Sequence, residues 1–84
     1  MPAKFTRRLD SQMRDQGETD YQRRLLRVNP VKSKRKSSII DSMVHEETHR
    51  IHPRMKERTV RATTKRKLRT MSPGAKRRLR GRYR

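Results

Sequence analysis

The 84-residue chain contains no cysteine and no tryptophan, and aromatic residues make up only 4% of it. Without cysteine there can be no disulfide and no thiolate metal site, so any metal ion must be held by histidine and carboxylate side chains. No hydrophobic run approaches the length of a signal peptide or of a membrane span. We therefore expect a cytoplasmic protein (in the host cytoplasm if it is viral) with no membrane partner.

Large apolar residues are scarce as well. Ile, Leu, Val and Phe together supply 13 of the 84 positions, which allows one small domain with a small core. A bound metal ion or a polyanionic partner would help such a domain to stay folded, through metal-coupled folding or mass action.

Positive charge is abundant. The chain has 26 Lys or Arg against 8 Asp or Glu, a formal net charge of +18. Residues 1–50 contain 12 basic and 7 acidic residues, a net +5, whereas residues 51–84 contain 14 basic and one acidic, a net +13. This density predicts salt-sensitive binding to nucleic acid through phosphate contacts, with little sequence preference. The residues expected to make these contacts are Lys65, Arg66, Lys67, Arg69, Lys76, Arg77, Arg78, Arg80, Arg82 and Arg84.

The N-terminal segment is ambiguous. Its apolar residues Phe5, Leu9 and Met13 follow one another at four-residue intervals, which favours a helix. That helix would end near Gly17. The alternative is a strand over residues 4–9 followed by a loop around Gly17, and the spacing alone does not separate the two.

A strand is predicted more clearly over residues 25–28, where alternating side chains face opposite ways. Asn29-Pro30 closes this run as a turn signal. The stretch that follows, residues 31–38, is expected to be a polar, basic connection. Ser37 or Ser38 at its end can cap the next helix.

Residues 39–52 have the periodicity of an amphipathic helix that ends before Pro53. Its apolar side carries Ile40, Val44 and Ile51. The opposite side carries all three histidines of the chain, which are His45, His49 and His52. A second, basic helix is expected over residues 55–71, and Ser72-Pro73 then marks the start of a short basic helix or tail.

The histidine side contains the motif H-E-x-x-H. His45 and His49 are four apart on a helix, so both can bind one Zn²⁺, and Glu46 beside them can take a proton from a water molecule at the metal. Zinc-peptidase motifs usually avoid charges between and after the ligands, yet Glu47 and Arg50 are charged here. The alternative interpretation is an exposed polar helix face that happens to carry histidines.

The segments around the motif resemble small H-E-x-x-H domains of phage and prophage genomes, related in plan to the SprT-like and ImmA-like zincins. The resemblance lies in Gly17 to Tyr21, in Leu26 to Pro30, and in Ile40-Asp41-Ser42 leading into the motif. It covers about residues 4–70 and implies an α+β mini-zincin: a small β-hairpin or sheet, an active-site helix and a second helix packed on it. It also favours a strand for the N-terminal segment. We expect this minimal domain over residues 1–71 and a basic C-terminal tail over residues 72–84.

The third zinc ligand remains open. SprT-like domains supply a further histidine several residues past the motif, but the position six after His49 is Met55 here. Glu57 is the only acidic residue after the motif, and near the start of the second helix it could turn back towards the metal, as in glutamate zincins. His52 is the alternative ligand, although one straight helix rarely offers i, i+4 and i+7 to one ion. We expect Glu57.

Two functions from different classes follow. The first is a zinc metallopeptidase-like domain, phage-related and associated with nucleic acid, in which Glu46 is catalytic and the substrate is a peptide or protein. The alternative is a small, highly basic nucleic-acid-binding or packaging protein without catalysis, in which the motif is accidental or holds a structural zinc ion.

Overall fold

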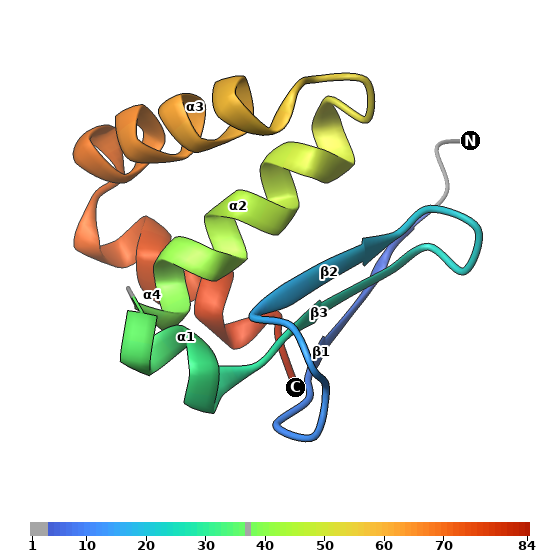
Figure 1. The fold of residues 1–84 in the computed structure, drawn as a ribbon. Coiled ribbons are helices and arrows are strands. Elements are labelled where there is room, and N and C mark those ends of the chain that lie inside the picture. The colour runs from blue at the N-terminus through green and yellow to red at the C-terminus, as the bar shows by residue number, and fades with distance from the viewer. Residues whose placement is uncertain (1–3, 37) are drawn as a thin grey trace.

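The computed structural model describes residues 4–36 and 38–84, which form an N-terminal sheet followed by helices (Figure 1). The strands are β1 (Thr6–Leu9), β2 (Gly17–Asp20) and β3 (Leu25–Val28). The helices are α1 (Pro30–Lys36), α2 (Ile39–Ile51), α3 (Glu57–Thr70) and α4 (Pro73–Gly81). The predicted α+β class is confirmed. None of the described helices has the length and apolarity needed to cross a membrane.

The sheet has the order β1-β3-β2, with β3 parallel to β1 and antiparallel to β2. Leu26 and Val28 of the central strand are fully buried. Because paired residues share a face, Thr19 lies beside Leu26, and Gly17 lies beside Val28, on the face that α2 covers. β2 therefore packs against α2, the helix that carries the motif.

The N-terminal ambiguity is resolved in favour of strands, but the predicted loop around Gly17 is wrong, because Gly17 begins β2. The reason is a close approach of β2 to α2. A Cβ atom at Gly17 would lie 2.4 Å from Oε2 of Glu46, so any other residue at this point of the strand would force the Glu46 side chain to shift. Gly17, which looks like a chain breaker in the sequence, instead leaves room for the Glu46 side chain of α2 beside the strand.

The stretch over residues 31–38, predicted as a polar, basic connection with no helix of its own, contains most of α1. Asn29 acts as a helix cap rather than as a turn residue: its Oδ1 accepts hydrogen bonds from the backbone N–H groups of Val31 and Lys32, both at 3.1 Å. Pro30 follows as the first helical residue, where a missing N–H costs nothing.

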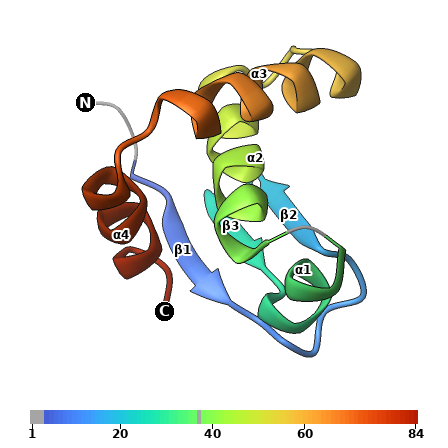
Figure 2. The same ribbon diagram turned by 90° about the vertical axis from the view of Figure 1, so that its left-hand side faces the viewer.

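α2 is the central element, with the sheet on one side and α3 on the other (Figures 1 and 2). It begins at the predicted cap, since Oγ of Ser38 accepts a hydrogen bond of 3.0 Å from the N–H of Asp41. Its first half supplies the core residue Met43. Ile51, which the periodicity assigns to the packed side, is 50% exposed because the core cluster does not reach the last turn.

The C-terminal residues belong to the packed fold. α4 begins at Ser72-Pro73 as expected and lies beside β1 (Figure 2). Leu79 and Tyr83 pack on the cluster formed with Leu26, Val28 and Met43. The backbone of Arg84 then continues along β1, where its C=O accepts a hydrogen bond of 2.8 Å from the N–H of Leu9.

Candidate metal centre

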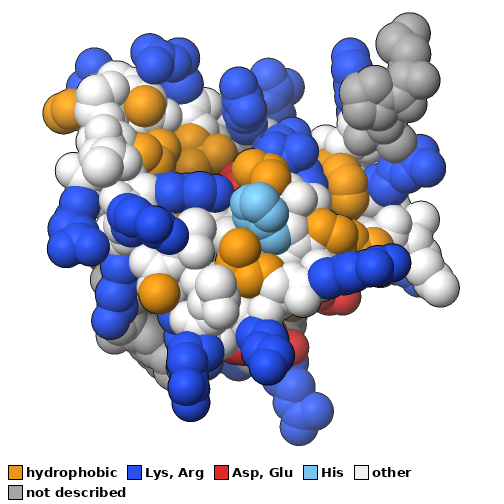
Figure 3. All heavy atoms as spheres, turned by 90° about the horizontal axis from the view of Figure 1, so that it is seen from above, with side chains coloured by type: hydrophobic (Ala, Val, Ile, Leu, Met, Phe, Trp, Pro, Cys, Tyr) orange, Lys and Arg blue, Asp and Glu red, His pale blue; other side chains and the backbone are white. Residues whose placement is uncertain are grey.

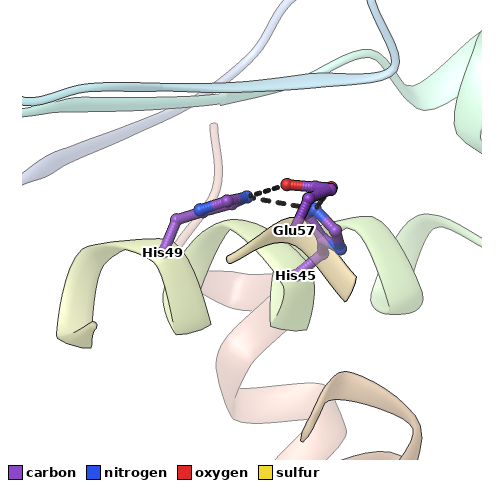
Figure 4. A group of neighbouring side chains, drawn as sticks. All are labelled: His45, His49 and Glu57. Carbon is purple, nitrogen blue, oxygen red and sulfur yellow. Dashed lines mark hydrogen bonds and ion pairs between the residues drawn. The ribbon is translucent and has the colours of Figure 1, made fainter. Parts of the chain in front are cut away.

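Two helices bring His45, His49 and Glu57 together (Figure 4). His45 and His49 lie one turn apart on α2, and their Nε2 atoms are 3.2 Å from each other. After Pro53 the chain turns back, so the first residue of α3, Glu57, faces both rings. Its Oε1 is 2.8 Å from Nε2 of His45 and its Oε2 is 3.1 Å from Nε2 of His49.

The three side chains are close enough together to hold a metal ion. In a tetrahedral site with bonds of about 2.0–2.1 Å, neighbouring ligand atoms lie about 3.3 Å apart. The ligand atoms here are all within 4.8 Å of one another, and among the described residues no other group of His, Asp or Glu meets this condition. Burial also lowers the pKa of His45, more than the nearby carboxylate of Glu57 raises it, which favours the neutral imidazole that binds metal.

His52 lies outside this group. It caps the C-terminal end of α2 and its side chain is exposed. Its backbone N–H donates a hydrogen bond of 2.9 Å to the C=O of Thr48, which ends the helix. Of the two candidates for the third ligand, the structure therefore places Glu57 beside the histidines and leaves His52 in solvent.

Glu46 points towards the sheet and is only 6% exposed. Its Oε1 accepts a hydrogen bond of 2.7 Å from the hydroxyl of Thr19 on β2. Burial raises the pKa of Glu46 to about 7, against the opposing effect of the Thr19 hydrogen bond. A carboxyl group in this environment can accept and return a proton near neutral pH.

His45, Glu46 and Glu57 line one cleft with a volume of 590 Å³. Of the 8 acidic residues in the chain, four line this cleft: Asp15, Asp41, Glu46 and Glu57. Arg61 and Lys65 of α3 complete its wall, and Nε of Arg61 is 3.7 Å from Oε1 of Glu57. The cleft is therefore the place where this strongly basic molecule concentrates negative charge.

Glu47, the charged residue inside the motif, has a structural explanation. It lies on another side of α2, nearly buried, and accepts hydrogen bonds from Arg7 (2.6 and 2.9 Å), Arg50 (3.0 Å) and Tyr83 (2.9 Å). Burial alone would raise the pKa of Glu47, but these donors outweigh it and hold the pKa below its usual value. Glu47 therefore joins α2 to β1 and to the C-terminal residues.

Two contributors to the site escaped the sequence reasoning, and one contact of a third residue was not foreseen. Thr19 and Gly17 could have been found only by recognising β2 as a strand, because its alternation then directs both residues to α2. Tyr21, at the turn after β2, donates a hydrogen bond of 2.8 Å to the C=O of His49. No local signal in the sequence indicates that contact.

The predicted phosphate-binding residues lie on α3, on α4 and in the residues that follow α4. Figure 3 shows Lys and Arg side chains spread around the histidines. Lys65 lines the cleft, whereas Lys67 is half-buried and donates a hydrogen bond of 3.2 Å to Oγ1 of Thr48. Tyr83 is 4% exposed and offers no surface for base stacking. The exposed members of the predicted set are Lys65, Arg66, Arg69, Arg77, Arg78, Arg80, Arg82 and Arg84, and Lys76 is partly exposed.

No protein-family model, curated protein or solved structure matches the chain.

Proposed function

We propose that the chain is a minimal zinc-dependent metallopeptidase whose basic helices hold it on nucleic acid. His45, His49 and Glu57 would hold the zinc ion, and Glu46 would act as the general base. The observation that carries this proposal is the convergence of three ligand atoms from α2 and α3 within 4.8 Å, beside a buried glutamate. The resemblance of the H-E-x-x-H segment to phage mini-zincins supports the same assignment.

A bound zinc ion would acidify a water molecule and polarise the carbonyl group of the substrate. The chain itself supplies the proton transfers. Glu46 accepts the proton of the attacking water and returns it to the leaving amine, while the hydroxyl of Thr19 fixes the orientation of its carboxylate at 2.7 Å. Arg61, on the wall of the cleft, is the cation placed to balance negative charge that develops on the substrate oxygen.

Zinc stoichiometry tests the ligand set. The protein, purified without a histidine tag, should bind about one Zn²⁺ per chain, and His45→Ala and His49→Ala should each abolish stoichiometric binding. Glu57→Ala should weaken zinc binding far more than His52→Ala, a control that removes an exposed imidazole three residues after His49. Equal zinc affinity in the Glu57→Ala and His52→Ala variants would contradict the proposed third ligand.

Thermal melting gives a second measure of the same ligands. Zinc that binds only the folded chain should raise the melting temperature of the parent protein. Glu57→Ala should remove most of this zinc-dependent rise and change the melting temperature of the zinc-free protein little, because its carboxylate is about half exposed. A large loss without zinc would show that Glu57 has a structural role.

The second candidate function is nucleic-acid binding or packaging without catalysis. It is favoured by the net charge of +18 and by the exposed cations of α3 and α4. Cleavage of a fluorescently labelled, unfolded casein by the zinc-loaded protein separates the two candidates. Zinc-dependent cleavage that Glu46→Gln abolishes supports the peptidase, whereas zinc binding without any cleavage supports the packaging protein.

Binding to nucleic acid is tested by the dependence of affinity on salt. Affinity for DNA should fall steeply as salt rises, because each phosphate contact releases counterions. Substitution of the exposed arginines of α4 should flatten the slope. Deletion of residues 73–84 is unsuitable for this test, since it would also remove Leu79 and Tyr83 from the core. A slope unchanged by the substitutions would place the binding surface elsewhere.

A further inference from the structure

A second hollow, which we call the α4 groove, lies between α2, α3 and α4 and shares no lining residue with the cleft of the metal centre. Its volume is 290 Å³. Its apolar lining consists of Val44 of α2, Met71 at the C-terminal cap of α3, and Ala75 and Leu79 of α4. Its charged lining consists of Glu47, Lys67, Arg78 and Arg82.

The charge of the α4 groove is positive. Glu47 already accepts hydrogen bonds from Arg7, Arg50 and Tyr83, and the two arginines balance its negative charge. Among the described residues, Arg78 and Arg82 form no ion pair with a carboxylate. An apolar hollow bordered by three cations attracts a ligand that combines an apolar, planar or aliphatic body with negative charge.

We propose that the α4 groove receives one base of a single-stranded nucleic acid, with the flanking phosphates on Lys67, Arg78 and Arg82. This inference rests on the nucleic-acid part of the proposed function. Apolar walls and guanidinium planes are surfaces on which unpaired bases stack, and every base has such a face. In a duplex the bases are stacked and would first have to be extruded, which costs a few kcal/mol.

The surroundings of the α4 groove favour a polymer over a small amphiphilic anion. A small anion would use only the three cations at the groove. The exposed cations continue beyond it along both helices, with Arg66 and Arg69 on α3 and Arg77 and Arg80 on α4. A strand of nucleic acid, unlike a small anion, is long enough to extend from the groove towards such arginines.

The test compares three probes of equal length at one salt concentration: a single-stranded DNA oligonucleotide, the same strand with abasic sites, and a duplex. The abasic strand keeps the phosphates but removes the bases. We expect the normal strand to bind about 5- to 100-fold more tightly than the abasic strand, in line with the stacking of one base. Equal affinity for the normal and abasic strands would overturn the inference.

Two matched pairs of substitutions test whether the base binds at the α4 groove. Arg78→Ala with Arg82→Ala removes two charges at the groove, and Arg77→Ala with Arg80→Ala removes the same charge from α4 away from it. Only the first pair should reduce the preference for the normal strand over the abasic one, while both pairs weaken binding to the abasic strand. An equal effect of the two pairs on that preference would overturn the inference. All four arginines are exposed, so both pairs of substitutions should leave the fold intact, which circular dichroism checks.

A variant without charge change completes the experiment. Ala75→Leu fills the groove and should lower the affinity for the normal strand towards that for the abasic strand. An unchanged preference in the folded Ala75→Leu protein would place the base elsewhere and overturn the inference. Absence of salt-dependent binding to any probe would overturn the nucleic-acid part of the proposed function as well, so the two failures are distinguishable.

Discussion

Two adjacent glutamates show how differently the two sides of α2 are built. Glu46 faces the sheet and the cleft, receives one side-chain hydrogen bond, from Thr19, and has a pKa raised to about 7. Glu47 faces β1 and the C-terminal residues, receives hydrogen bonds from three side chains and has a lowered pKa. Both are nearly buried. Burial alone therefore does not decide the direction in which the pKa of these carboxylates shifts. The donors around Glu47 outweigh burial, and the single donor to Glu46 does not.

The largest expected effect is on catalysis. Glu46→Gln keeps the shape of the side chain but cannot accept a proton, so cleavage of labelled casein should fall about 10²–10⁴-fold while zinc binding is retained. Glu47→Asp retains a carboxylate on the other side of the helix and should leave a folded protein with most of its activity. Loss of zinc in the Glu46→Gln protein would show that Glu46 is a ligand, and the general-base assignment would then be wrong.

The next effect concerns stability. Glu47→Ala leaves Arg7, which is only partly exposed, without its buried partner, and such a change costs about 3–5 kcal/mol of the free energy of unfolding. Glu18→Ala is the control, since Glu18 pairs with Arg27 near the surface and should cost at most about 1 kcal/mol. Urea unfolding of the two variants measures the difference. Equal costs would contradict the structural role given to Glu47.

A smaller loss is expected when only one donor to Glu47 is removed. Tyr83→Phe keeps the ring in the core but deletes the hydroxyl that lies 2.9 Å from Oε2 of Glu47, a hydrogen bond to a charged group worth about 1.5–3 kcal/mol. Tyr21→Phe is the matched control, because its hydroxyl is exposed and bonds to a backbone carbonyl. Urea unfolding should show the larger loss for Tyr83→Phe, and the reverse order would count against the network.

The smallest effect tests the contact between β2 and α2. Gly17→Ala places a Cβ atom against Oε2 of Glu46 and should cost about 1–3 kcal/mol through overpacking, with a loss of activity as the carboxylate shifts. Gly81→Ala is the control, since nothing lies within 4 Å of a Cβ atom there. Thermal melting and casein cleavage report the two consequences separately. An active, stable Gly17→Ala protein would show that β2 and the Glu46 side chain can move apart to admit the Cβ atom.

The elements that could be predicted from the sequence carry a periodic signal within a few residues. The helix with His45 and His49 is such a case, because spacing alone places both rings on one side. The choice of Glu57 over His52 was also possible from the local sequence, because the chain turns at Pro53 and Glu57 is the only acidic residue that follows it. That these side chains bind zinc is still a prediction.

The elements that could not be predicted depend on contacts between distant segments. Gly17 looks like a loop residue because the carboxylate that excludes a side chain there belongs to α2. Glu47 looks like an unwanted charge in the motif because its donors Arg7 and Tyr83 come from the two ends of the described chain. Such pairings leave no periodicity in the sequence, and propensity alone does not indicate them.

The connection between Arg7, Glu47 and Tyr83 also has a consequence for the order of folding. The three proposed zinc ligands lie within one local stretch, from His45 to Glu57, so a short helical hairpin can bring them together early. The core closes only when Tyr83 reaches a strand near the other end of the sequence, and contacts at such separation form slowly. We therefore expect the proposed ligands to assemble before the core closes, so that zinc, bound as proposed, would stabilise this hairpin before the rest of the chain folds onto it.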